Sequence, residues 1–134
     1  MSTKLSLKDP NPGVWFKFDE SDPKSGEIAL RPANNAKREE IIKKTVKRRV
    51  EYKHGQRFEV NESNDNKFSE MLWDYCIVDW KDLVDDSKKE IPCTTENKVF
   101  FMKNHVGFAS FVGEKLATLN DQYEINLTLE KENL

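Results

Sequence analysis

The side chains that most often catalyse reactions or bind metals are scarce in this chain. Two histidines, His54 and His105, and two cysteines, Cys76 and Cys93, are the candidates for a nucleophile, a base or a metal ligand. Neither histidine is near a nucleophile motif, a phosphate-binding loop or ligands at metal spacing. The cysteines lack a CxxC neighbour, so we expect two reduced thiols. The sequence therefore predicts a protein that is not an enzyme and that has no catalytic residue, cofactor or metal.

A run of cations over residues 37–57 offers a second kind of chemistry, the binding of phosphate. The run holds nine Lys or Arg against three Glu, whereas the 134-residue chain carries a net charge of -2. On a helix, five cations would share the face that phosphate binding requires. Glu40 and Glu51 lie on that same face, so a solvated helix surface is favoured over binding to nucleic acid. The opposite charges of the two parts of the chain also allow self-association. The five cations are Lys37, Lys43, Lys44, Lys47 and Arg48.

Two charged residues fall within otherwise apolar helical arcs. Arg49 projects into the apolar side of the basic helix, and Asp79 lies near the centre of an apolar arc on the following one. An unpaired carboxylate inside a protein is costly. We therefore hypothesise that Arg49, with Arg38 as second choice, bonds Asp79 and fixes the register of the two helices. The alternative is that each side chain reaches water at the edge of its arc.

The apolar spacing predicts a single globular domain over residues 14–120. Its expected fold class is mainly α (α+β), with an N-terminal β-hairpin packed on a bundle of about four helices. The hairpin is expected over residues 14–31, and the helices over about 36–53, 66–84, 95–104 and 107–120.

The two ends of the chain have weaker patterns. Residues 1–13 are expected to form a flexible lead, and residues 121–134 either extend the last helix or form a loose tail. The first residues lack the apolar core of a signal peptide, and no run approaches the roughly 18 apolar residues that span a bilayer. We therefore expect a cytoplasmic protein without a membrane partner.

The helix expected over 66–84 is apolar on two sides, so it must be covered on two sides. One interpretation is a partner-binding stripe, because aromatic anchors dominate interfaces. The plainer one is that the hairpin face with Val14, Phe16 and Phe18 covers it. The last helix carries a further apolar stripe. The candidate partner-binding residues are Trp73, Ile77, Trp80 and Val84 of the first stripe, and Phe108, Phe111, Leu116 and Leu119 of the second.

Several short segments in fixed order form a pattern of aromatic and turn positions. They are Val14-Trp15-Phe16, Arg38-Glu39, Asp74-Tyr75-Cys76-Ile77-Val78-Asp79-Trp80-Lys81-Asp82-Leu83, Ile91-Pro92-Cys93-Thr94, Thr95-Glu96-Asn97-Lys98 and Phe108-Ala109-Ser110-Phe111-Val112. This pattern covers about residues 14–120 and resembles the tail assembly chaperones of long-tailed, siphovirus-like bacteriophages and prophages. Members of that family often have Gly in the turn after the Trp helix, where this chain has Lys88-Lys89.

The resemblance implies a small, mainly helical, non-catalytic protein made in the cytoplasm of the bacterial host and absent from the mature virion. Its implied partners are the tape measure protein, whose apolar helices it would keep from aggregating, and the tail tube protein, which it would help to recruit. Many relatives also have a longer form made by a ribosomal frameshift. Two alternatives are a phage structural or head-tail connector protein, and a small nucleic-acid-binding regulator that uses the basic helix.

Overall fold

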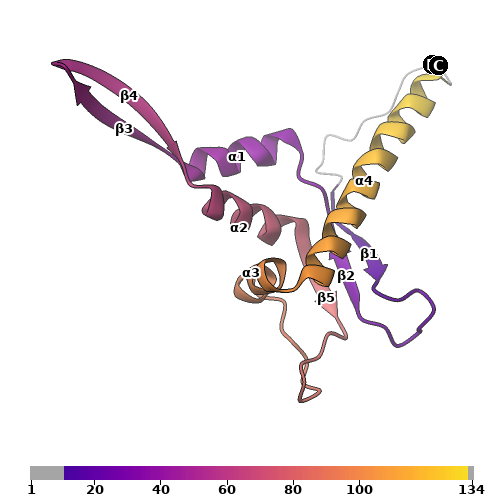
Figure 1. Ribbon diagram of the computed structural model, residues 1–134. Helices are drawn as coiled ribbons and strands as arrows, with labels where there is room; N and C mark the ends of the chain where they lie inside the picture. Colours follow the sequence, from indigo (N-terminus) through magenta and orange to yellow (C-terminus); the bar gives the residue numbers. More distant parts are fainter. Residues whose placement is uncertain (1–10, 133–134) are drawn as a thin grey trace.

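The computed structural model describes residues 11–132, and the side chains as far as Asp121. In this part of the chain, four helices and five strands follow one another along the sequence (Figure 1). Residues 1–10 of the flexible lead expected over residues 1–13 lie outside the described part of the chain. The order is β1 (Val14–Lys17), β2 (Glu27–Leu30), α1 (Asn35–Thr45), β3 (Val46–Lys53), β4 (Gln56–Ser63), α2 (Asp65–Cys76), β5 (Ile77–Lys81), α3 (Thr95–Asn104) and α4 (Val106–Glu132).

The predicted fold class is wrong, because the described chain is a mixed α/β protein with two small sheets instead of a hairpin on a helical bundle. Two of the expected helices are only half helical. The helix expected over 36–53 ends at Thr45 and continues as β3, and the one expected over 66–84 ends at Cys76 and continues as β5. The segments that leave the helices each carry three β-branched or aromatic residues, types that favour strands.

The first sheet has three strands in the order β1-β2-β5, all antiparallel. The expected hairpin over 14–31 is thus part of a larger sheet, completed by a strand from the middle of the chain. The central strand β2 is deeply buried, with Ile28, Ala29 and Leu30 at 2% exposure or less. The register shifts between Ala29 and Leu30, which pair with Asp79 and Ile77, so Val78 of β5 is the extra residue of a β-bulge.

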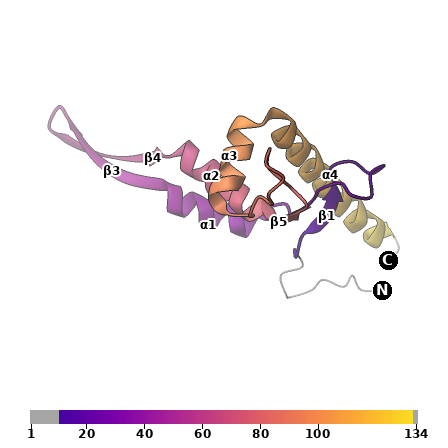
Figure 2. The same cartoon turned by 90° about the horizontal axis from the view of Figure 1, so that it is seen from below.

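The second sheet is a two-stranded ribbon of β3 and β4, which we call the arm. It pairs Val46 with Ser63 at its root and Lys53 with Gln56 at its tip. The tip is a two-residue turn of His54 and Gly55, both with positive φ, at 52° and 76°. Two consecutive residues of this kind match the twist of a hairpin and are typical of a type I′ turn. Figures 1 and 2 show that the arm projects away from the rest of the molecule.

The main core lies between the three-stranded sheet and α4, which crosses it (Figures 1 and 2). Strand residues and residues from one side of α4 meet there in an apolar cluster. Phe16 and Phe18 pack against the same cluster from the hairpin side. The buried members are Ile28, Leu30, Ile77, Trp80, Phe108, Val112 and Leu119.

A polar cluster joins α2 to α3. Thr94 caps α3 by accepting a hydrogen bond from the Asn97 backbone N–H. The buried Lys98 ammonium then donates to the Asp74 backbone oxygen and to Asp74 Oδ1, both at 3.1 Å, and the Thr95 hydroxyl donates to Oδ1 at 2.7 Å. Burial alone would raise the pKa of Asp74, but these donors outweigh it and hold the pKa below its usual value.

We predict that Asp74→Asn destabilises the protein at pH 7 by less than about 1 kcal/mol, because the carboxylate is partly exposed. A lowered pKa stabilises the fold above the ordinary Asp value of 3.8 and loses this effect as pH falls through the folded value. Urea unfolding at pH 7 and near pH 2 should therefore show a smaller difference from the parent at the lower pH. The exposed loop variant Asp86→Asn is the control. An equal difference at both pH values would contradict the charged role of Asp74.

Candidate protein-binding groove

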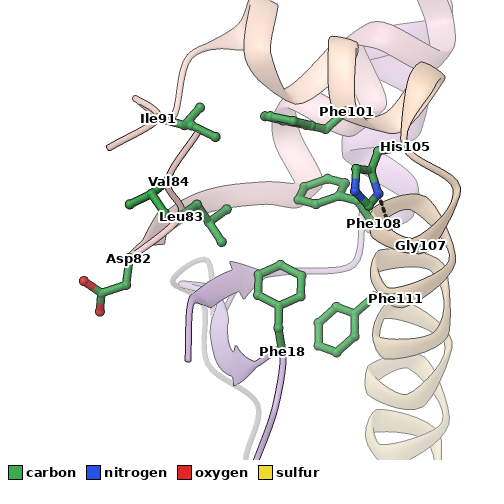
Figure 3. Close-up of a pocket in the computed structure, with 10 residues that line it drawn as sticks. All are labelled: Phe18, Asp82, Leu83, Val84, Ile91, Phe101, His105, Gly107, Phe108 and Phe111. Atoms are coloured by element: carbon green, nitrogen blue, oxygen red, sulfur yellow. Dashed lines mark hydrogen bonds between the residues drawn. The ribbon is translucent and has the colours of Figure 1, made fainter. Parts of the chain in front are cut away.

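One side of the sheet opens into a depression that we call the aromatic groove, with a volume of about 440 Å³. It lies between the end of β1, the loop after β5, and the junction of α3 and α4 (Figure 3). Most of its surface is apolar, because seven of its ten lining residues have aromatic or aliphatic side chains. These seven come from distant parts of the sequence. The lining residues are Phe18, Asp82, Leu83, Val84, Ile91, Phe101, His105, Gly107, Phe108 and Phe111.

Aromatic rings form the floor and one wall. Phe18 lies 4.6 Å from Phe111 and 6.0 Å from Phe108, measured between ring centroids. Phe101 lies 5.5 Å from Phe108. Behind them, the buried Trp80 meets Phe101 and Phe108 edge-on at 5.9 and 6.0 Å. Tilted and edge-on contacts of this kind stabilise ring pairs beyond their simple burial, so the wall is a fixed surface.

The loop after β5 forms the opposite wall. It folds back on itself, with the Ile91 N–H donating to the Leu83 oxygen at 2.8 Å and Val84 bridged to Glu90. The Trp80 indole N–H donates to the Ile91 oxygen at 2.7 Å and so ties the loop to the sheet. Gly26 lies against this loop, where a Cβ atom would be 2.5 Å from Leu83 Cδ2. The loop is therefore held from two sides, and its apolar side chains face the rings.

At the tip of this loop, the backbone makes a tight turn. The Asp85 carboxylate accepts hydrogen bonds from the N–H groups of Ser87 and Lys89 at 2.8 and 3.1 Å. Lys88 has a φ of +63°, in the left-handed region where a residue other than Gly is strained. A turn of this form favours Gly at that position.

His105 stands at the rim, between α3 and α4. Its backbone N–H donates to the Phe101 oxygen and ends α3, and its Nδ1 accepts from the Phe108 N–H at 3.1 Å, at the start of α4 (dashed line in Figure 3). The side chain thereby satisfies one of the free donors of the α4 N-terminus. His105 therefore ends the helix that carries Phe101 and caps the helix that carries Phe108.

The groove is suited to binding an apolar side chain and not to acid–base chemistry. Its only ionisable lining residues are Asp82, whose carboxylate is directed away from the rings in Figure 3, and His105, whose Nδ1 is engaged. Burial raises the pKa of the Cys76 and Cys93 thiols, which makes both poor nucleophiles. Among the side chains described, from Asn11 to Asp121, no three His, Cys, Asp or Glu gather as metal ligands.

The eight residues predicted to bind a partner fall into three groups. Phe111 and Val84 line the aromatic groove, and Phe108 contributes its ring from a buried position. Trp73 and Leu116 are half-buried outside it. The remaining three are buried core residues: Ile77, Trp80 and Leu119.

Sequence reasoning missed Phe18, Leu83, Ile91 and Phe101 as groove residues. Phe18 follows β1 and Phe101 lies within α3, whereas Leu83 and Ile91 belong to an irregular loop. Phe18 lies on the alternating face of the expected hairpin, which indicates burial, but no periodic pattern placed any of the four in a groove. The one signal in the sequence was the apolar-proline step Ile91-Pro92, which marks the return of the loop to the body.

The hypothesised pair of Arg49 and Asp79 is not formed. Arg49 lies on the arm, where it bonds Glu51 at 2.7 Å and approaches Glu62 at 3.8 Å. Asp79 lies in β5 with its side chain accepting from the Trp80 N–H. The helical wheel placed both residues on arcs that do not exist, because their helices end before reaching them.

The five cations assigned to one helical face are also separated. Lys37, Lys43 and Lys44 remain on α1, but Lys47 and Arg48 belong to β3. On α1, Glu40 accepts from Lys37 at 3.3 Å and from Lys44 at 3.1 Å, which neutralises part of the surface. The helix alone is therefore a weak site for a polyanion.

Comparison with known proteins adds no relative. No protein-family model, no characterised protein and no solved structure matches this chain. In the part of the chain that the structure covers, none of the helices has both the length and the apolarity to cross a bilayer.

We predict that His105→Ala lowers the free energy of unfolding by about 1 kcal/mol, because the first turn of α4 loses its cap. His105→Asn, which keeps a side-chain acceptor at the same position, should lose less. Urea unfolding of the three proteins measures the difference. Equal stability of the Ala and Asn variants would show that the Phe108 N–H does not need this acceptor.

Proposed function

We propose that this protein is a non-catalytic tail assembly chaperone of a long-tailed phage or prophage, which binds apolar segments of the tape measure protein in the aromatic groove. The observation that carries the proposal is the groove itself. It is an open, ring-lined depression with the 52% exposed Val84 at its edge, on a chain in which 34% of the residues are charged. An open apolar surface of this kind marks a binding site.

The resemblance in sequence supports the same proposal. The segments around Trp80, Ile91 and Phe108 that carry the resemblance supply five of the ten residues that line the groove, namely Asp82, Leu83, Ile91, Phe108 and Phe111. The turn with Lys88 adds to this, because relatives often have Gly there and the backbone adopts a conformation that Gly favours.

The physical requirements of a helix chaperone agree with the groove. A volume of about 440 Å³ accepts one or two large apolar side chains, which corresponds to the anchors of an amphipathic helix. Each contact of this size is weak. Many copies along one long helical protein would still cover it, because neighbouring copies that also touch one another gain avidity.

The proposed setting follows from this role. The protein acts in the cytoplasm of the bacterial host during tail morphogenesis, helps to recruit tail tube subunits to the covered tape measure protein, and is absent from the mature virion. A structural or head-tail connector protein would instead remain in purified particles, so mass spectrometry of virions separates the two classes.

We predict that Val84→Asp lowers co-purification of the co-expressed tape measure protein by about tenfold or more, because binding would bury a carboxylate against the rings. The matched control is Val106→Asp, which changes an 81% exposed valine outside the groove lining. Affinity purification followed by quantitation of the tape measure protein provides the measurement.

Three results would count against the proposal. They are the absence of tape measure protein from the purified wild-type complex, equal losses in both variants, and normal tails from a phage in which this gene is deleted.

A further inference from the structure

The arm contributes no residue to the aromatic groove, and much of its apolar surface is exposed to solvent. Val50, Tyr52 and Phe58 are 43%, 74% and 44% exposed, although they are large apolar side chains. A ribbon of two strands is marginally stable on its own. Both of its strands are also edge strands, and each presents unpaired backbone groups to its surroundings.

The turn determines which backbone groups of β3 are free. In a hairpin with a two-residue turn, the pair that flanks the turn exchanges both backbone hydrogen bonds, and the pairs then alternate along the strands. Lys53 and Gln56 flank this turn. The N–H and C=O groups of every second residue back along β3 therefore point outward, and these residues are Val46, Arg48, Val50 and Tyr52.

The outer edge of β3 is complementary to itself. With two copies antiparallel and a twofold axis at Val50, each Val50 pairs with its counterpart through outward backbone groups. Each Arg49 then lies opposite Glu51 of the second copy, and each Arg48 lies opposite Tyr52, a favourable contact of a cation with a ring. Only Lys47 and Lys53, at the ends of the overlap, face a like charge.

Pairings that involve the outer edge of β4 are worse. On β4 the outward residues are Arg57, Glu59, Asn61 and Ser63, by the same alternation. A twofold axis at Arg57 or Glu59 places identical charges opposite each other. An axis at Asn61 leaves few paired residues within the strand. Pairing of β3 with β4 of another copy does not close and would continue as an open ladder.

We propose that two copies of this chain pair antiparallel through the outer edge of β3, with the twofold axis at Val50, so that two arms form one four-stranded sheet. The overlap covers seven residues of each β3 strand, from Lys47 to Lys53. Because the arm projects away from the body, the two bodies lie at opposite ends of the shared sheet (Figures 1 and 2). The contact is isologous and closed, so it stops at the dimer.

The charge of the arm favours a second copy of the chain over nucleic acid as its binding partner. The arm has five Lys or Arg against three Glu. Glu51 and Glu62 lie beside Arg49, and Glu59 lies 3.9 Å from Arg57, so part of the positive charge is already compensated. This leaves few free cations for a phosphate backbone.

A pair of proline variants tests the edge. Val50→Pro removes an outward N–H of β3 and leaves the hydrogen bonds inside the arm in place. Glu59→Pro, at the residue directly opposite, does the same on the β4 edge and is the matched control. In sedimentation equilibrium of the purified full chain, Val50→Pro should weaken the dimer about tenfold to hundredfold, since two hydrogen bonds between the copies are lost. Glu59→Pro should keep it.

Two outcomes of this experiment overturn the proposal. One is a wild-type protein whose dimer is weaker than about 1 mM. The other is an equal effect, or equal lack of effect, of the two prolines. Neither outcome involves the tape measure protein, so a failure here is separate from a failure of the proposed function.

Charge reversal tests the register. Arg49→Glu alone places two pairs of glutamates opposite each other in the dimer, and Glu51→Arg alone places two pairs of arginines. Each variant should therefore dimerise about tenfold or more weakly than the parent. An equal mixture restores both opposite-charge pairs, so native mass spectrometry should find the heterodimer in excess over both homodimers. A mixture that associates no better than its components overturns the register.

Monomeric protein that binds a DNA or RNA duplex in a salt-dependent way at 0.15 M salt would assign the arm to nucleic acid instead.

Discussion

The side chain of Trp80 connects four parts of this protein. Its ring meets Phe101 of α3 and Phe108 of α4, and its N–H holds the loop after β5 through the Ile91 oxygen. Its backbone belongs to β5, the strand that completes the main sheet. A large ring with one polar atom suits this position, because it fills the core and satisfies a loop carbonyl at the same time. Trp80 thereby connects the two walls of the groove.

The protein is stabilised in two different ways. The body depends on an apolar cluster of residues far apart in the sequence, which includes Ile28 of β2 and Val112 of α4. The arm depends on its own cross-strand pairs and on exposed ion pairs, such as that of Arg49 with Glu51. Exposed ion pairs contribute little each. The arm is therefore the region expected to open first when the protein is destabilised.

Local chemistry was predictable from the sequence, and the partition between helix and strand was not. The helix α3 has the bounds that its capping residue Thr94 indicates, and the strands β1 and β2 follow their alternation. The segment that begins at Val46 is ambiguous, because Val46 and Val50 are four apart, as in a helix, whereas Val50 and Tyr52 are two apart, as in a strand. The dipeptide His54-Gly55 directly follows the helix expected over 36–53, yet it is the turn of a hairpin.

The groove was less predictable than the elements. Its walls come from Phe18, from the loop with Leu83 and Ile91, and from both sides of the break at His105. Their proximity depends on β5 joining the N-terminal strands, a contact between residues about fifty positions apart in the sequence. Periodicity within a short window carries no information about such a contact. Phe108 and Phe111 were identified because they lie on a regular helix, and Phe18 was not identified as a site residue because only the fold brings it to them.

The root of the arm connects it mechanically to the body. The helix α1 passes into β3 without an intervening residue, and Asn64 alone separates β4 from α2. At this junction, the Asn64 N–H donates to the Thr45 oxygen at 3.0 Å. This bond joins the end of α1 to the start of α2 at the root of the arm. With no flexible linker, a force applied at the tip acts on α1 and α2 over a distance of about 26 Å, given the rise of eight strand residues. A change in the orientation of the arm is therefore expected to move α1 and α2 with it.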